Sequence, residues 1–133
     1  MADLTLDQFM SGLLAGLALE DRRVVSIKGD AFYARVVNVF NRLEERKGDF
    51  DVEPTFWITQ HPFHGDSPAV RQAISGAVKS NLVSLDNPEY QDMRLRITPA
   101  QARTLLRRIP GGEDLYRELA REFLESSGSL PVA

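Results

Sequence analysis

The stretch that decides the fold spans residues 67–98 and reads SPAVRQAISGAVKSNLVSLDNPEYQDMRLRIT. It begins as a helix, because Ser67 can cap the N-terminus and Pro68 suits the first helical position. Apolar side chains then recur at helical spacing and predict a buried face. These are Val70, Ala73, Ile74, Ala77 and Val78. The opposite, polar face carries Arg71, Gln72, Ser75, Gly76 and Lys79.

After this helix the apolar residues alternate with polar ones, which is the pattern of half-buried strands. The alternating apolar residues are Val83, Leu85, Met93, Leu95 and Ile97. Between them, residues 86–92 are rich in turn formers. A helix with a polar outer face, followed by a hairpin with outward arginines, is the plan of a winged helix. In that plan the helix enters a DNA groove and the hairpin lies along the backbone.

Two runs resemble the wing of winged-helix bacterial regulators of the multiple-antibiotic-resistance type. In residues 79–89 a Leu-Val pair follows the helix and a turn with Asn-Pro-Glu follows that pair. In residues 94–100 basic residues alternate along a strand that runs into Thr-Pro. The resemblance implies a winged-helix domain that binds DNA. It also implies that N- and C-terminal helices pair between subunits.

The polar helix face and the hairpin arginines are the candidate DNA-binding residues. Arginine and glutamine can read base edges, and lysine and arginine can neutralise phosphates. The candidate set is Arg71, Gln72, Ser75, Lys79, Arg94 and Arg96. The alternative function is a winged-helix-like protein-interaction or assembly module without DNA binding or catalysis. Three acidic residues of the turn would repel phosphates: Asp86, Glu89 and Asp92.

Charge is distributed unevenly along the chain. The net charge is −3, but residues 68–110 contribute +4 from seven basic and three acidic side chains. Residues 1–67 contribute −4 and residues 111–133 contribute −3. The basic excess therefore falls on the helix and hairpin described above, as expected for a DNA-binding surface. An uneven solvated surface would give the same distribution.

The N-terminal part predicts two helices and a strand. Thr5 and Gln8 form a capping box, and an apolar stripe follows it. The stripe contains Leu6, Phe9, Met10, Leu13, Leu14 and Leu17. A short strand at Val24–Ile27 leads to a helix that begins at Asp30 and ends at Gly48. Its buried residues are predicted to be Phe32, Val36, Val39, Phe40 and Leu43.

Residues 49–67 have no clear period. Phe56–Thr59 is aromatic and β-branched, which indicates a short strand or a buried anchor for the connection. We expect the large aromatic residues here, Phe56, Trp57 and Phe63, to pack onto the core.

The C-terminal part predicts two further helices and a tail. Thr98-Pro99 starts one helix, and Pro110-Gly111-Gly112 ends it. The last helix runs from Glu113 to Glu125, and residues 126–133 form a flexible tail. The last helix has its own apolar stripe, which includes Leu115, Leu119 and Phe123. This stripe can pack on the first helix within one chain or across a two-fold axis, and we expect a homodimer.

The predicted fold class is α+β and mostly helical, with about five helices in one domain over residues 1–125. Three segments form a small antiparallel sheet: Val24–Ile27, Leu82–Leu85 and Met93–Ile97. An alternative fold adds Phe56–Thr59 as a full strand of the sheet, giving an α/β-like sandwich.

Several function classes lack support in the sequence. The chain has no cysteine, so it has neither disulfides nor thiolate metal ligands. His61 and His64 lie near Asp66, but Pro62 and Gly65 interrupt any helix that would align them. We therefore expect no metal, no cofactor and no catalytic residue. No apolar run reaches the length of a membrane span, and the acidic N-terminus is not a secretory signal. We expect a cytoplasmic protein without membrane contact.

Overall fold

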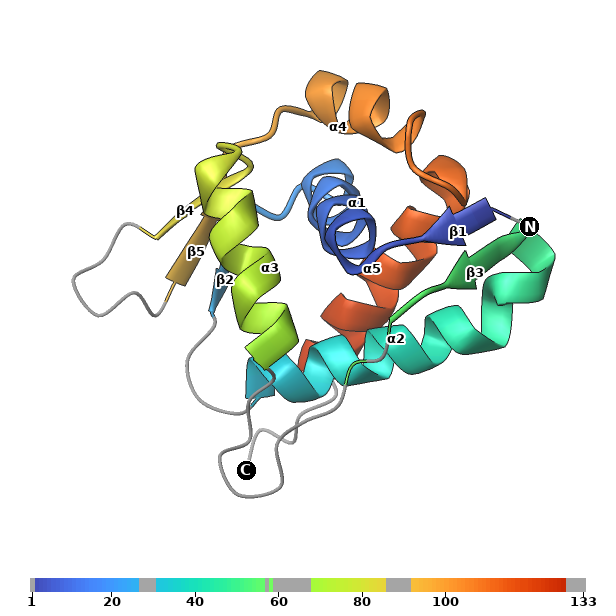
Figure 1. The fold of residues 1–133 in the computed structure, drawn as a ribbon. Helices are drawn as coiled ribbons and strands as arrows, with labels where there is room; N and C mark the ends of the chain where they lie inside the picture. The colour runs from blue at the N-terminus through green and yellow to red at the C-terminus, as the bar shows by residue number, and fades with distance from the viewer. Residues whose placement is uncertain (1, 27–30, 57, 59–67, 86–91, 129–133) are drawn as a thin grey trace.

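The computed structural model describes residues 2–26, 31–56, 58, 68–85 and 92–128. Within these residues the chain forms five helices and two small sheets (Figure 1). The helices are α1 (Leu6–Leu19), α2 (Ala31–Phe50), α3 (Pro68–Lys79), α4 (Pro99–Leu106) and α5 (Gly112–Gly128). The strands are β1 (Ala2–Leu4), β2 (Val24–Ser26), β3 (Val52–Pro54), β4 (Val83–Leu85) and β5 (Asp92–Leu95). The predicted α+β, mostly helical class is confirmed.

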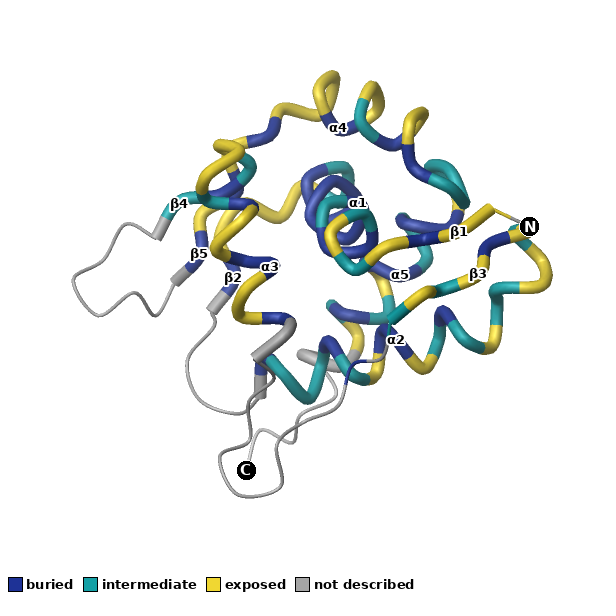
Figure 2. Tube along the Cα trace, in the orientation of Figure 1, coloured by how far each residue is buried: buried dark blue, intermediate teal, exposed yellow. Residues whose placement is uncertain are grey.

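Helix α1 lies at the centre, and α3, α4 and α5 pack around it (Figure 1). The predicted capping box starts it: Gln8 N donates to Thr5 Oγ1 at 3.1 Å, and Thr5 N donates to Gln8 Oε1 at 2.9 Å. Every residue from Gly12 to Ala18 is buried (Figure 2). A helix buried on all sides is a core helix. The predicted apolar stripe is thus only one part of its buried surface.

Helices α1 and α5 approach each other closely through two glycines. A Cβ on Gly12 would overlap the ring of Tyr116, and one on Gly16 would overlap the Tyr116 carbonyl and crowd Ala120. Tyr116 is fully buried, and its hydroxyl donates to the Pro110 carbonyl at 3.1 Å. The two glycines therefore set the distance between the first and last helices of one chain.

Helix α2 lies along α5 and extends past its predicted end. All five residues predicted to face inward are buried. The predicted stop at Gly48 is wrong, because the helix continues through this glycine to Phe50. Asp51 follows with φ 56° and takes the left-handed conformation that usually ends a helix at glycine. Arg46 stabilises the last turn, since its guanidinium lies 2.8 Å from Asp49 and over the Phe50 ring.

The antiparallel sheet has the strand order β2-β5-β4. Its register pairs Val24 with Arg94, and Arg94 with Ser84. One face is buried and carries Val25, Val83, Met93 and Leu95. The sheet predicted from alternation is confirmed. β5 begins one residue earlier than predicted, at Asp92, and ends at Leu95, and β4 begins at Val83. Ile27 lies outside the described residues.

A second, two-stranded sheet was missed. β1 pairs with β3 in parallel, with Ala2 opposite Val52 and Leu4 opposite Pro54. Both strands are three residues long and have no alternating pattern, so no local signal marks them. The alternative fold with Phe56–Thr59 as a sheet strand is not found, since neither Phe56 nor Ile58 lies in a strand.

The connection after β3 is anchored as expected where the structure describes it. The Phe56 ring lies 5.4 Å from the rings of Phe9 and Phe40, and Ile58 is buried. Trp57 and Phe63, which were expected to join them, lie outside the described residues.

The C-terminal helices begin largely as predicted. Thr98 caps α4 through a capping box with Gln101. Helix α5 continues to Gly128, so the first three residues of the predicted tail are helical. Residues 129–133 lie outside the described part of the chain.

The glycine contact predicts opposite effects for two matched substitutions. Gly16→Ala would place a methyl group in the Tyr116 carbonyl, so it should lower the free energy of unfolding by about 1–3 kcal/mol. Gly48→Ala, on the exposed part of α2 with open space around it, should raise that free energy by up to ~1 kcal/mol. Urea denaturation measures both. Equal effects of the two substitutions would contradict the close α1–α5 contact.

Because Tyr116 is buried, we expect the free energy of unfolding to fall at alkaline pH. Burial raises the pKa of its hydroxyl well above the ordinary value, so the folded chain keeps a proton that the unfolded chain releases. The contribution of Tyr116 is complete below about pH 10, the unfolded pKa, and falls as pH rises above it. Tyr116→Phe should lose roughly 1 kcal/mol at neutral pH with the Pro110 hydrogen bond, but depend less on pH above 10. Parallel slopes for both proteins in alkaline urea denaturation would contradict this assignment.

Candidate nucleic-acid interface

The polar face of α3 is exposed. Arg71, Gln72, Ser75, Gly76 and Lys79 all lie on the surface (Figure 2). The opposite face is buried, as predicted, through Val70, Ala73, Ile74 and Ala77, and the helix packs mainly on α1 and β4. Among the described helices, none covers the polar face of α3. Within the described part of the chain, this face is therefore exposed to solvent.

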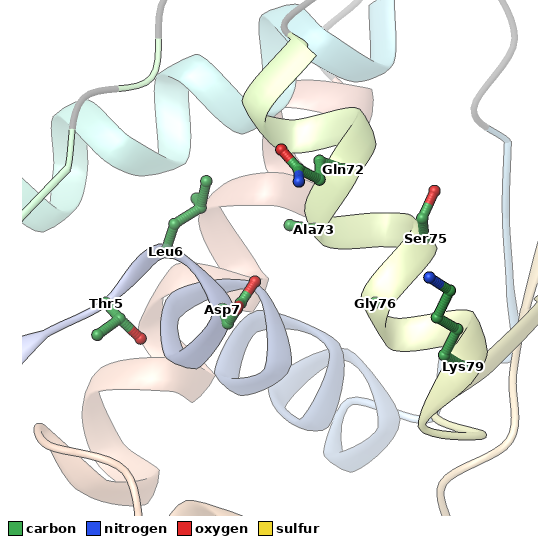
Figure 3. A pocket seen from close by; sticks show the side chains of 8 residues that line it. All are labelled: Thr5, Leu6, Asp7, Gln72, Ala73, Ser75, Gly76 and Lys79. Carbon is green, nitrogen blue, oxygen red and sulfur yellow. The ribbon is translucent and has the colours of Figure 1, made fainter.

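A groove of about 480 Å³ separates this face from the start of α1 (Figure 3). Its lining from α3 is Gln72, Ala73, Ser75, Gly76 and Lys79. Its lining from α1 is Thr5, Leu6 and Asp7. In the sequence, Thr5 belongs to a capping box and Leu6 to an apolar stripe, and nothing local shows that α1 begins beside α3. The groove is therefore a product of tertiary packing.

The groove carries both signs of charge. Lys79 and Asp7 both line it, together with the Gln72 amide and the Ser75 hydroxyl. The Ser75 hydroxyl donates to the Arg71 carbonyl at 3.3 Å, which leaves its oxygen free to accept. A surface with donors, acceptors and one carboxylate suits a partner that also presents both donors and acceptors. Base edges in the major groove are such a partner.

A tight turn brings Arg96 beside the end of α3. Asn81 takes φ 60°, and Leu82 N donates to the Ala77 carbonyl at 3.0 Å, which closes the helix. The Leu82 carbonyl then accepts from Arg96 N at 2.8 Å. Arg96 is therefore hydrogen-bonded to Leu82, which follows Lys79 by three residues in the tight turn after α3.

The two hairpin arginines lie on the outward side of β5 and its extension. Both are exposed, whereas Met93, Leu95 and Ile97 between and beside them are buried. Arg94 has Val24 and Ser84 as its cross-strand neighbours. The structure thus divides the candidate residues into an α3 group and a β5 group. In the α3 group, Gln72, Ser75 and Lys79 line the groove, and Arg71 is not part of its lining. The tip of the hairpin, residues 86–91, lies outside the described residues.

Pairing of β2 with β5 brings two further arginines, Arg22 and Arg23, to the β5 group, and no local signal in the sequence marks them. Leu95 N donates to the Arg23 carbonyl at 2.7 Å, and the Arg23 guanidinium donates to the Ile97 carbonyl at 3.1 Å. The Leu95–Arg23 bond extends the pairing one residue beyond Val24, so Arg22 and Arg96, the next residue on each segment, lie near the end of this sheet. In the sequence, Arg22 and Arg23 belong to a charged break between elements. Only the strand register shows that they join the β5 group.

The described residues contain neither a metal-binding cluster nor a membrane-spanning helix. Among them, no group of His, Asp and Glu side chains could hold a metal ion, and His61 and His64 lie outside them. In the same residues, no helix combines the length and the apolar character needed to cross a bilayer. Comparison with models of known families, with curated proteins and with solved structures gives no match.

Proposed function

We propose that the chain binds double-stranded DNA, with α3 at the major groove and the β5 arginines at the backbone. The observation that carries this proposal is the exposed polar face of α3, which keeps Arg71, Gln72, Ser75 and Lys79 accessible. A helix fits the major groove, and glutamine and arginine are side chains that read bases there. The +4 charge of residues 68–110 adds attraction to phosphates.

The order of elements supports a winged-helix-like role. Helix α1 leads to β2, two helices follow, and the β4–β5 hairpin receives β2 on its second strand. The long connection between α2 and α3 departs from the short turn of the regulators that the sequence resembles. Transcription regulation is the biological role that this proposal implies, through binding rather than catalysis.

A protein-interaction module is the second candidate, and one observation favours it. Asp7 lines the groove beside α3, where a carboxylate weakens attraction to phosphate. Leu6 and Ala73 give the same groove apolar surface. A protein segment with mixed side chains would use both features.

Binding to a random duplex tests the first candidate. Fluorescence anisotropy at about 50 mM salt should show binding that weakens steeply as salt rises. Gln72→Ala and Lys79→Ala should each weaken it, and Lys79→Ala should reduce the salt slope by about one. Arg42→Ala on α2 removes the same charge from a residue paired with Glu45 and Glu122, and should leave binding unchanged. No binding by the wild-type chain would remove DNA and favour the interaction module.

The homodimer was expected because two apolar helix stripes at the ends of the chain needed to be buried, and this argument no longer requires a second subunit. The two terminal stripes pack on each other within one chain, because α1 and α5 are in close contact. We therefore expect light scattering of the free chain to give a mass near 14.9 kDa. A mass of about twice this value would restore the homodimer and a two-fold symmetric DNA site.

A further inference from the structure

We propose that a row of basic side chains at the open end of the hairpin binds successive phosphates of the same DNA. The basic row consists of Lys79, Arg96 and Arg22, and it extends the contact from α3 across the sheet to the turn before β2. It rests on the proposed DNA binding. It adds a binding site on the α1–β2 turn, outside the helix and hairpin.

Backbone hydrogen bonds place the three residues next to one another. The Leu82 carbonyl accepts from Arg96 N at 2.8 Å, and Lys79 precedes Leu82 by one tight turn. On the other side, the Arg23 carbonyl accepts from Leu95 N at 2.7 Å, so Arg22 neighbours Arg96. Adjacent strands are about 4.8 Å apart. The row therefore runs from the end of α3, past the end of β5, to the residues before β2.

Arg23 acts as a positioning residue for the row. Its guanidinium donates to the Ile97 carbonyl at 3.1 Å, across the end of β5. This bond ties the α1–β2 turn to the start of the β5–α4 connection. Arg22 is consequently held on a fixed backbone beside Arg96.

The charges of the basic row are not neutralised by the chain that the structure describes. Lys79, Arg96 and Arg22 are exposed, and none forms an ion pair with a described residue. Glu20, in the same turn as Arg22, pairs instead with Arg121 at 2.6 Å and Arg117 at 3.8 Å. Exposed Asp21 is the remaining acid there. Like charges close together across strands are destabilising. Binding of a polyanion would therefore offset the repulsion between Arg22 and Arg96.

The position of the basic row also indicates which end of the β4–β5 hairpin contacts the DNA backbone. The sequence between β4 and β5 holds Asp86 and Glu89, which repel phosphates, whereas the other end of the strands holds the basic row. The contact is therefore at the base of the hairpin. A nucleic-acid backbone is favoured over an acidic protein because its charges repeat at regular spacing along a line.

Two substitutions in the full chain test the row. Arg22→Gln and Arg96→Gln should each weaken binding to a random duplex roughly threefold to tenfold and reduce the salt slope by about one. Arg42→Gln on α2 is the matched control, since Arg42 lies outside the row and outside the basic segment 68–110. It should leave the salt slope unchanged. Thermal unfolding of both row variants should match the wild type or exceed it, because a repulsion is removed.

The outcomes separate this inference from the proposed function. If Gln72→Ala weakens binding but Arg22→Gln and Arg96→Gln behave as the wild type, the basic row is overturned and DNA binding by α3 stands. If the wild-type chain binds no duplex, both proposals are overturned. If polyglutamate of matched charge competes as well as the duplex, the assignment of the row to a nucleic-acid backbone is overturned.

Discussion

The contact between Gly12, Gly16 and Tyr116 is the constraint on which the rest of the fold depends. It allows α5 to lie against α1 at a distance that side chains larger than hydrogen would forbid. With α5 on one side, α1 presents its other sides to α3 and α4. The position of α3, and with it the exposed polar face, follows from this packing. The candidate interface is thus fixed by residues that are remote from it in sequence.

Ion pairing separates the molecule into two electrostatic parts. Two arginines of α2 pair with acidic residues of α5, and Arg117 and Arg121 of α5 pair with Glu20. Arg42 lies 3.3 Å from Glu122, and Arg46 lies 2.9 Å from Glu118. In the α3 and β5 groups, Lys79 and Arg96 have no such match among the described residues. Each exposed ion pair contributes little to stability, but it cancels the charge of its own cation. Lys79 and Arg96, which are not paired with a described residue, therefore contribute positive potential to the surface.

Local signals in the sequence were sufficient for most of the fold. Thr5 and Thr98 cap helices through side-chain contacts three residues away, so their motifs are complete in the sequence. The alternation of Met93, Arg94 and Leu95 likewise needs no distant partner to be interpreted. The same is true of the polar face of α3, whose residues were named correctly as exposed.

Features that depend on distant contacts could not be predicted. β1 and β3 are strands only because they pair with each other, and residues 5–7 line a groove only because α3 lies beside them. The helix end at Phe50 depends on Asp51 adopting a conformation that glycine adopts more readily, so Gly48 gave a misleading signal. Arg22 joins a basic surface through strand register alone.

The pairing of the first helix with the last has a consequence during synthesis. During synthesis α1 emerges from the ribosome well before α5, the partner that covers Gly12 and Gly16. Until then one side of a strongly apolar helix has no native neighbour, and contacts of such long sequence separation form slowly. Exposed apolar surface of this kind favours aggregation in a nascent chain. The native packing of α1 therefore cannot be complete until α5 has been synthesised.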